Sequence, residues 1–286
     1  MFEMYMIDNV TCHIEEALPT SWSANTFTVI GNFPMYIAGL CALKEGGLAY
    51  GHEMPSWVYY FAAAAITHFS WFDIMDGQRA RRLKCGTPIG RIIDEAGDMF
   101  IYTWVAFIMG YVVKVEPGWL CLSYGLILLP AYTQEMIFVT TGKYNYISGA
   151  FDIGPVEIEL IMTSIFLSAA IFGTQSMNDP INTVFGVDFI PMGDWLKLNQ
   201  VYCCFFVFLL LLFSLDNLRD TFAKDFNLSL RMITTPVILF AHVVTAGYLE
   251  VYSYRKNFAL FYLMFGLTMG NAIYRLMIAN MTKKVH

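Results

Sequence analysis

Long apolar stretches are the feature that most restricts the fold of this chain. The hydrocarbon core of a bilayer is about 30 Å thick, and a helix needs about 20 apolar residues to cross it. Lipid offers the backbone no hydrogen bonds, so such stretches must be helical. The sequence therefore predicts an all-α polytopic membrane protein with about eight transmembrane helices, covering residues 26–43, 56–72, 98–114, 118–140, 156–174, 196–214, 229–250 and 257–281.

The composition agrees with a membrane protein and excludes other classes. Charged residues make up 14% of the chain and hydrophobic residues 57%, whereas soluble domains average about 25% charged. The net charge of −6 argues against a nucleic-acid partner. The six cysteines show no Cys-x-x-Cys spacing, so we expect neither a disulfide framework nor a zinc site. Residues 181–193 are too short to span the bilayer and are predicted to be interfacial or re-entrant.

Residues 1–24 differ from the rest of the chain. Apolar residues between Phe2 and Leu18 recur at roughly helical spacing, with acidic residues between them. This pattern predicts an amphipathic helix in the membrane interface; a loosely ordered polar tail is the alternative. We see no signal-peptide pattern and no internal repeat. We therefore expect an N-terminal interfacial segment over 1–24 and a single membrane domain over 25–286.

The distribution of Lys and Arg predicts an orientation. If the N-terminus and residues 73–98 share one side of the membrane, that side carries 11 of these residues and the other side carries 5. The positive-inside rule then places residues 73–98 on the cytoplasmic side, or on the matrix side in a mitochondrion. A water-soluble substrate would reach them from there.

A polar stretch at residues 73–98 interrupts the apolar pattern. Asp73 and Asp76 are three residues apart and Asp94 and Asp98 are four apart, so each pair lies on one face of a helix. Two such helices facing each other would bring four carboxylates together, a ligand set that suits Mg²⁺, Mn²⁺ or Ca²⁺ beside a phosphorylated substrate. Surface charge at two solvated helix ends is the alternative, but ionisable residues between membrane-grade apolar flanks are functional by default.

This stretch resembles the signature of the CDP-alcohol phosphotransferase family, Asp-x2-Asp-Gly-x2-Ala-Arg-x8-Gly-x3-Asp-x3-Asp. Every fixed position is filled. The surroundings resemble the choline/ethanolamine phosphotransferase branch, with Ala80-Arg81-Arg82, the sequence Gly154-Pro155-Val156-Glu157, and Ala279-Asn280-Met281-Thr282-Lys283, in which Asn280 replaces a His. Segment 23–28 resembles the entry to the branch's first membrane helix, with Ala24 in place of a Pro.

The resemblance implies a metal site and a nucleotide site. Asp73, Asp76, Asp94 and Asp98 would hold Mg²⁺ or Mn²⁺, with two ions as in the family. The CDP group would lie against small or polar residues, and Arg81 would pair with a phosphate. For three of these residues another role stays open, namely helix packing for the small Gly77 and Ala80 and helix capping for Asn25. The implied CDP-binding residues are Asn25, Gly77, Ala80, Arg81 and Gly90.

Three nearby cations are expected to have a different role. Arg79, Arg82 and Lys84 are predicted to be loop charges or contacts to lipid headgroups.

The sequence departs from the branch at the residues expected to move a proton. The branch has a His after the third Asp and a Glu after the second Gly, whereas this chain has Glu95 and Arg91 at these positions. Three interpretations remain. Glu95 is the base, assisted by Glu157; or Asp98 is the base; or the chemistry is lost and the fold is kept.

These observations support two hypotheses. The first is a metal-dependent enzyme that transfers phosphoethanolamine or phosphocholine from a CDP-alcohol to diacylglycerol or another lipid in phospholipid biosynthesis, in the endoplasmic reticulum or Golgi. The second is a catalytically impaired relative that binds membrane phospholipids as a structural subunit of a larger complex, such as a respiratory assembly of the mitochondrial inner membrane. The second rests on the departures at Arg91 and Glu95 and on the branch's last two helices, which do not follow Lys283. A homodimer is the expected assembly if the chain is not part of a larger complex.

Overall fold

A computed structural model describes residues 5, 7–49, 51–114, 123, 126–142, 154–186, 195–248 and 256–282. The described residues form helices, and no strand occurs among them. The long helices are α3 (Ala24–Gly46), α4 (Ser56–Arg82), α5 (Pro88–Val113), α7 (Leu129–Thr141), α8 (Pro155–Phe172), α10 (Leu198–Lys224), α11 (Phe226–Tyr248) and α13 (Phe258–Thr282). An all-α polytopic membrane fold is confirmed.

Each of the eight predicted apolar stretches contributes to one of these helices. Five are long and apolar enough to cross a bilayer within the described residues, namely α3, α5, α8, α10 and α11. Helix α4 carries the charged motif at its C-terminal end, α7 has 13 described residues, and α13 contains Asn271 and Arg275. The segment predicted to be interfacial or re-entrant contains the short helix α9 (Ile181–Phe185), and residues 187–193 lie outside the described part.

The helix boundaries have local causes. Ser23 accepts a hydrogen bond from the Thr26 backbone N–H and caps α3, as N-cap serines do. Thr87 caps α5 in the same way by accepting from the Gly90 N–H at 2.9 Å, and Pro88 occupies the first helical position, where its missing N–H costs nothing. Pro155 has the equivalent place in α8. The beginning of α5 is therefore well specified, and it carries Gly90 and Asp94.

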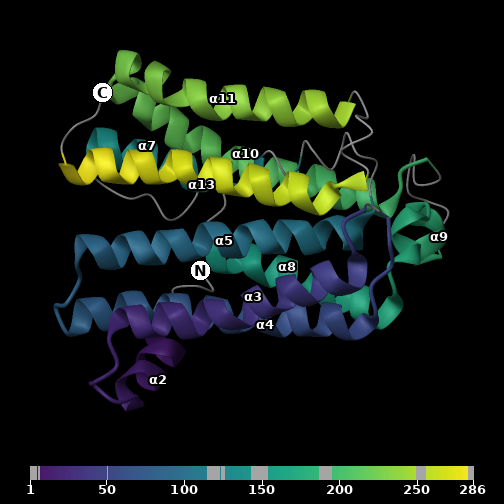
Figure 1. The fold of residues 1–286 in the computed structure, drawn as a ribbon, viewed down its shortest axis with the longest axis horizontal. Helices are drawn as coiled ribbons and strands as arrows, with labels where there is room; N and C mark the ends of the chain where they lie inside the picture. Colours follow the sequence, from purple (N-terminus) through teal and green to yellow (C-terminus); the bar gives the residue numbers. More distant parts are fainter. Residues whose placement is uncertain are drawn as a thin grey trace.

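The helices form one bundle whose long members run side by side along the long axis of the molecule (Figure 1). Helix α3 packs on α4 and α5, α8 packs on α4, and α13 packs on α5 and α7. Close approach of α3 to α5 depends on small residues. A side chain at Gly39 would collide with Trp104, and one at Gly97 would collide with Asn32. At one end of this bundle α3 begins, α4 ends and α5 begins (Figure 1).

The N-terminal segment folds back on that end of the bundle. It consists of a π-helical turn at Ile7–Thr11 followed by α2 (Cys12–Ala17), and α2 packs against α4 (Figure 1). Glu15 is buried and pairs with Arg79 and with Arg82. The described part of this segment is therefore an ordered partner of α4. Its assignment as a separate interfacial segment stays a prediction.

Candidate metal and nucleotide site

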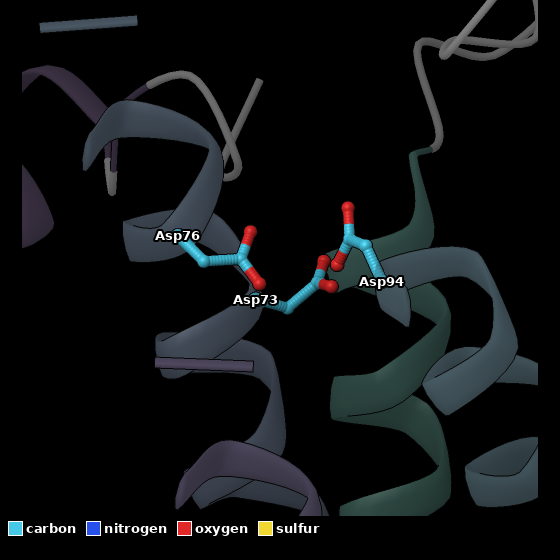
Figure 2. A group of neighbouring side chains, drawn as sticks. All are labelled: Asp73, Asp76 and Asp94. Atoms are coloured by element: carbon cyan, nitrogen blue, oxygen red, sulfur yellow. The ribbon is translucent and has the colours of Figure 1, made fainter. Parts of the chain in front are cut away.

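The first three aspartates of the motif converge between α4 and α5. Asp73 and Asp76 come from the C-terminal part of α4, and Asp94 comes from the second turn of α5. One carboxylate oxygen from each lies within 4.8 Å of those of the other two. Figure 2 shows the three carboxylates facing a common point from two helices. The three-residue spacing of Asp73 and Asp76 aligns these two side chains on one face of α4, and the packing of α5 brings Asp94 opposite them.

Asp98 lies one helical turn beyond Asp94 on α5 and outside this group of three. Its carboxylate interacts electrostatically with Asp73 and Asp94. Within the described part of the chain, Asp94 Oδ1 and Asp98 Oδ1 are buried and accept no hydrogen bond. Asp76, in contrast, accepts from Thr28 Oγ1 at 2.5 Å.

The donor set fits a hard divalent cation. Three clustered carboxylates repel one another at close range, and buried anions persist only when they are paired or bind a metal. Oxygen donors of this type suit Mg²⁺ and Mn²⁺. The orphaned oxygens of Asp94 and Asp98 are thus the atoms that a cation would satisfy.

A cavity of about 530 Å³ opens beside the cluster. This volume lies in the range of small-molecule sites. Asp76 and Asp94 form part of its wall, so a ligand in the cavity would reach the carboxylate cluster. Four residues predicted to bind CDP also line it: Asn25, Gly77, Ala80 and Gly90. The structure therefore brings together residues of α3, α4 and α5 that lie up to 65 positions apart in the sequence.

Three of the predicted nucleotide-binding residues have informative surroundings. Asn25 is not the cap of α3, because Ser23 takes that role. A Cβ at Gly90 would lie 3.1 Å from Asn25 Oδ1, so glycine there keeps this side of the cavity open. Arg81 is not among the residues that line the cavity, but its guanidinium Nη1 would lie 3.3 Å from a Cβ at Gly77. It is therefore close to the wall.

Arg79 was predicted to be a loop charge or a contact to lipid headgroups, and this prediction is wrong. Its side chain is fully buried, its Nε lies 2.7 Å from Glu15 Oε1, and its Nη2 donates to the backbone oxygens of Leu18 and Pro19. A buried guanidinium needs such partners. Arg82 is more exposed and pairs with the same glutamate. The reason for the error is that the N-terminal segment covers the end of α4.

The residues predicted to move a proton lie in different places. Glu157 accepts from the Gly154 backbone N–H at 2.9 Å and so contributes to the cap of its own helix. Glu95 lies on α5 and interacts electrostatically with Glu135 and Asp94. Asp98 lies close to Asp73 and Asp94, as described above.

Helices α7 and α8 each contribute a buried glutamate that the motif does not include. Glu159 accepts from Tyr102 at 2.7 Å and from Ser70, and it interacts electrostatically with Asp73. Glu135 lies 2.5 Å from Arg91 Nη2. A sequence signal existed for both, since each is a charged residue within an apolar helix. Glu135 is the one charged residue of α7, and Glu159 shares α8 with Glu157.

Fold and site together define a polytopic membrane protein with a carboxylate cluster that suits a divalent cation, beside a cavity of about 530 Å³. Residues 22–246 match the family model described as CDP-alcohol phosphatidyltransferase. The match covers more than half of the chain, and the chain belongs to this family.

Curated relatives agree with the family and differ in how far they are characterised. The chain is 28% identical over 169 residues, 57% of its length, to choline/ethanolaminephosphotransferase 1 of Saccharomyces cerevisiae. It is 26% identical over 134 residues to an uncharacterized CDP-alcohol phosphatidyltransferase class-I family protein of Dictyostelium discoideum, and 28% identical over 163 residues to one of Schizosaccharomyces pombe. The matches span 40%, 32% and 40% of these proteins, respectively.

Proposed function

We propose that this protein transfers phosphoethanolamine or phosphocholine from a CDP-alcohol to diacylglycerol and releases CMP. The observation that carries the proposal is the convergence of Asp73, Asp76 and Asp94 beside a cavity that is also lined by Asn25, Gly77, Ala80 and Gly90. A CDP-alcohol needs both parts, since its pyrophosphate carries the charge that a cation neutralises and its nucleoside needs a cavity of this size.

Asp73, Asp76, Asp94 and Asp98 are the residues that would hold Mg²⁺ or Mn²⁺, and we propose two ions. When bound there, such cations would supply positive charge that offsets the negative charge developing on the leaving CMP. The chain's own residues do the remaining work. Gly77, Ala80 and Gly90 keep the wall free of side-chain bulk so that the donor can approach. We propose that Asn25, which lines the cavity, and Arg81, which lies close to its wall, bind the polar groups of the donor.

The transfer also requires removal of a proton from the lipid hydroxyl. The hydroxyl oxygen forms a bond to the phosphorus that carries the alcohol, the bond from that phosphorus to CMP breaks, and CMP leaves with the electron pair. A carboxylate takes the hydroxyl proton. We assign this step to Glu95 or Asp98, because both lie on α5 beside Asp94. The predicted assistance by Glu157 is the weaker part, since that side chain caps α8.

The membrane setting follows from the same proposal. The acceptor and product are lipids and the donor is water-soluble. The end of the bundle where α3 begins, α4 ends and α5 begins would therefore lie at the membrane surface, where the donor arrives. We propose the cytoplasmic face of the endoplasmic reticulum or Golgi, with a homodimer as the assembly. If the protein is instead a subunit of a larger complex, the mitochondrial inner membrane, with the motif on the matrix side, is the expected location.

The test is a transfer assay with purified protein, Mg²⁺ or Mn²⁺, diacylglycerol, and labelled CDP-ethanolamine or CDP-choline. We expect labelled phospholipid from the wild type, and no product from Asp98→Ala. A Glu95→His variant restores the base of the branch and serves as a parallel sample. An inactive wild type with an active Glu95→His variant would show that the donor site is intact and the base is lost.

Absence of product in all samples, with lipid retained on the purified protein, would favour the structural alternative. The departure at Glu95 is the observation behind that alternative. Stoichiometric co-purification with other membrane subunits would then be the expected accompanying result.

A further inference from the structure

The cavity wall contains one cation whose position the motif does not explain. Among the described residues that line the cavity, Arg91 is the cationic side chain. It lies on the first turns of α5, three residues before Asp94, and therefore on the same helix face. A guanidinium close to a metal-binding carboxylate lies near the place where a pyrophosphate must be.

Two residues of α7 hold this guanidinium in place. Glu135 Oε1 lies 2.5 Å from Arg91 Nη2, and the Arg91 guanidinium carbon lies 4.5 Å from the centre of the Phe138 ring. Phe138 also lines the cavity. The carboxylate holds one nitrogen of the guanidinium, and the ring supports the group by a cation–π contact. An arginine held on two sides loses little entropy when it binds a ligand.

The Arg91 side chain faces the cavity. It lines the wall, and 22% of the side chain is accessible. The planar guanidinium matches the geometry of phosphate oxygens. Glu135 is buried and is not among the residues that line the cavity.

We infer that Arg91, positioned by Glu135 and Phe138, binds a phosphate group of the CDP donor. The inference rests on the proposed function and adds α7 to the donor site. It also gives a function to Arg91, which stands where the choline/ethanolamine phosphotransferase branch has a Glu. The donor's negative charge is bound on two sides, by the cation site of the aspartates and by the guanidinium of Arg91.

The experiment compares the binding of CDP and of cytidine to the purified full-length protein in Mg²⁺ by calorimetry. Cytidine lacks the phosphates, so the ratio of the two affinities reports phosphate recognition. The variants are Arg91→Lys and the double variant Arg91→Gln with Glu135→Gln, which avoids leaving a buried carboxylate without its partner. Arg219→Gln is the matched control, because Arg219 is an exposed arginine of α10.

We expect the double variant to bind CDP about tenfold more weakly than the wild type, as loss of a charged hydrogen bond predicts, with cytidine binding unchanged. Arg91→Lys should lose less, and Arg219→Gln nothing. A wild type that prefers CDP to cytidine and a double variant that keeps this preference would overturn the inference and leave the proposed function intact. Equal wild-type affinities for CDP and cytidine would overturn both.

A lipid phosphate is the other source of the same chemistry. Vesicles that contain phosphatidic acid provide the second arm of the experiment. If the double variant loses vesicle binding and keeps its CDP affinity, Arg91 binds a lipid headgroup and the inference for the donor is wrong. We expect unchanged vesicle binding.

Discussion

Two sets of acidic residues in this molecule differ in their partners. The motif aspartates come from adjacent helices. Within the described residues, Asp94 Oδ1 and Asp98 Oδ1 accept no hydrogen bond, and Asp76 accepts one from Thr28. The second set consists of single glutamates from distant segments, Glu15, Glu135 and Glu159. Each of these is bound to partners on α4 or α5.

The comparison separates two functions of a buried carboxylate. A single carboxylate bound to side-chain donors of the protein acts by positioning those donors. Several carboxylates that face one another can instead bind a cation, which neutralises their charge. We therefore interpret the aspartates as the cation site and the three glutamates as supports that fix the position of α4 and α5 side chains around it.

The largest effect on activity is expected from Asp94→Asn, which tests the assignment of the aspartates to the cation site. The substitution keeps the shape and removes the charge of a proposed cation ligand at the centre of the cluster. We expect the transfer rate to fall about a thousandfold, with little change in thermal unfolding, because relief of repulsion among the aspartates offsets the lost group. A rate within a few fold of the wild type would show that Asp94 is not a ligand.

Glu15→Gln should have the opposite signature. It breaks a buried pair with Arg79, whose side chain is fully buried, and loss of one partner of a buried pair costs about 3 kcal/mol. We expect a clear loss of stability in thermal unfolding in detergent, and a smaller loss of activity at a temperature where the variant is folded. The matched control is Glu16→Gln, since Glu16 is an exposed neighbour.

The substitution Glu159→Gln tests the role of the buried glutamate that interacts with Asp73. Glutamine can accept from only one of Tyr102 and Ser70, both of which donate to Glu159 in the wild type. We expect kcat to fall about tenfold with little change in the KM for the donor. Glu157→Gln provides the comparison, because glutamine caps a helix as glutamate does. A larger effect at Glu157 than at Glu159 would favour the role that the family resemblance gave to Glu157.

Gly97→Ala perturbs the framework without touching a charge. A Cβ at Gly97 would collide with the side chain of Asn32 on α3, and overpacking of this kind costs about 1 to 2 kcal/mol. Gly39→Ala creates a similar collision with Trp104. Both should lower thermal stability, but only Gly97→Ala, which is next to Asp98, should lower the transfer rate of the folded protein.

The smallest effect is expected at the ion pair between the exposed Glu53 and the partly buried Lys114. The hydrogen bond from Lys114, followed by its charge, lowers the pKa of Glu53 from its ordinary value. A lowered pKa in the folded protein contributes stability above the unfolded-state pKa, and this contribution is lost as the pH falls through the folded-state pKa. The thermal midpoints of wild type and Glu53→Gln should differ slightly at neutral pH and coincide in acid. A large difference would contradict the contrast between exposed and buried glutamates.

The two sets of acids also differ in how well the sequence predicted them. The sequence predicted that Asp73 and Asp76 share a helix face, because helical spacing is a local property. It also predicted that four aspartates meet between two helices, and the structure brings Asp73, Asp76 and Asp94 together with Asp98 outside the group. The apolar stretches predicted the helices for the same reason. The beginning of α5 could be read from Thr87 and Pro88.

Contacts between distant segments could not be predicted. Nothing in the local sequence states that Glu15 meets Arg79 or that Glu135 meets Arg91, since these pairs are separated by 64 and 44 residues. The sequence did mark Glu135 and Glu159 as ionisable residues in apolar helices. Their partners depend on how α7 and α8 pack, which no periodicity encodes.

The most direct test of the account is the stoichiometry of the reaction and its dependence on a cation. CMP and labelled phospholipid would be measured together, from CDP-ethanolamine and diacylglycerol, with Mg²⁺ present and then with Mg²⁺ removed by a chelator. We predict equal amounts of CMP and phospholipid with Mg²⁺ and neither product after its removal, with recovery when Mg²⁺ returns. Phospholipid formation in the presence of the chelator, or CMP release without phospholipid, would contradict the claim that the aspartate cluster is the cation site of a transferase.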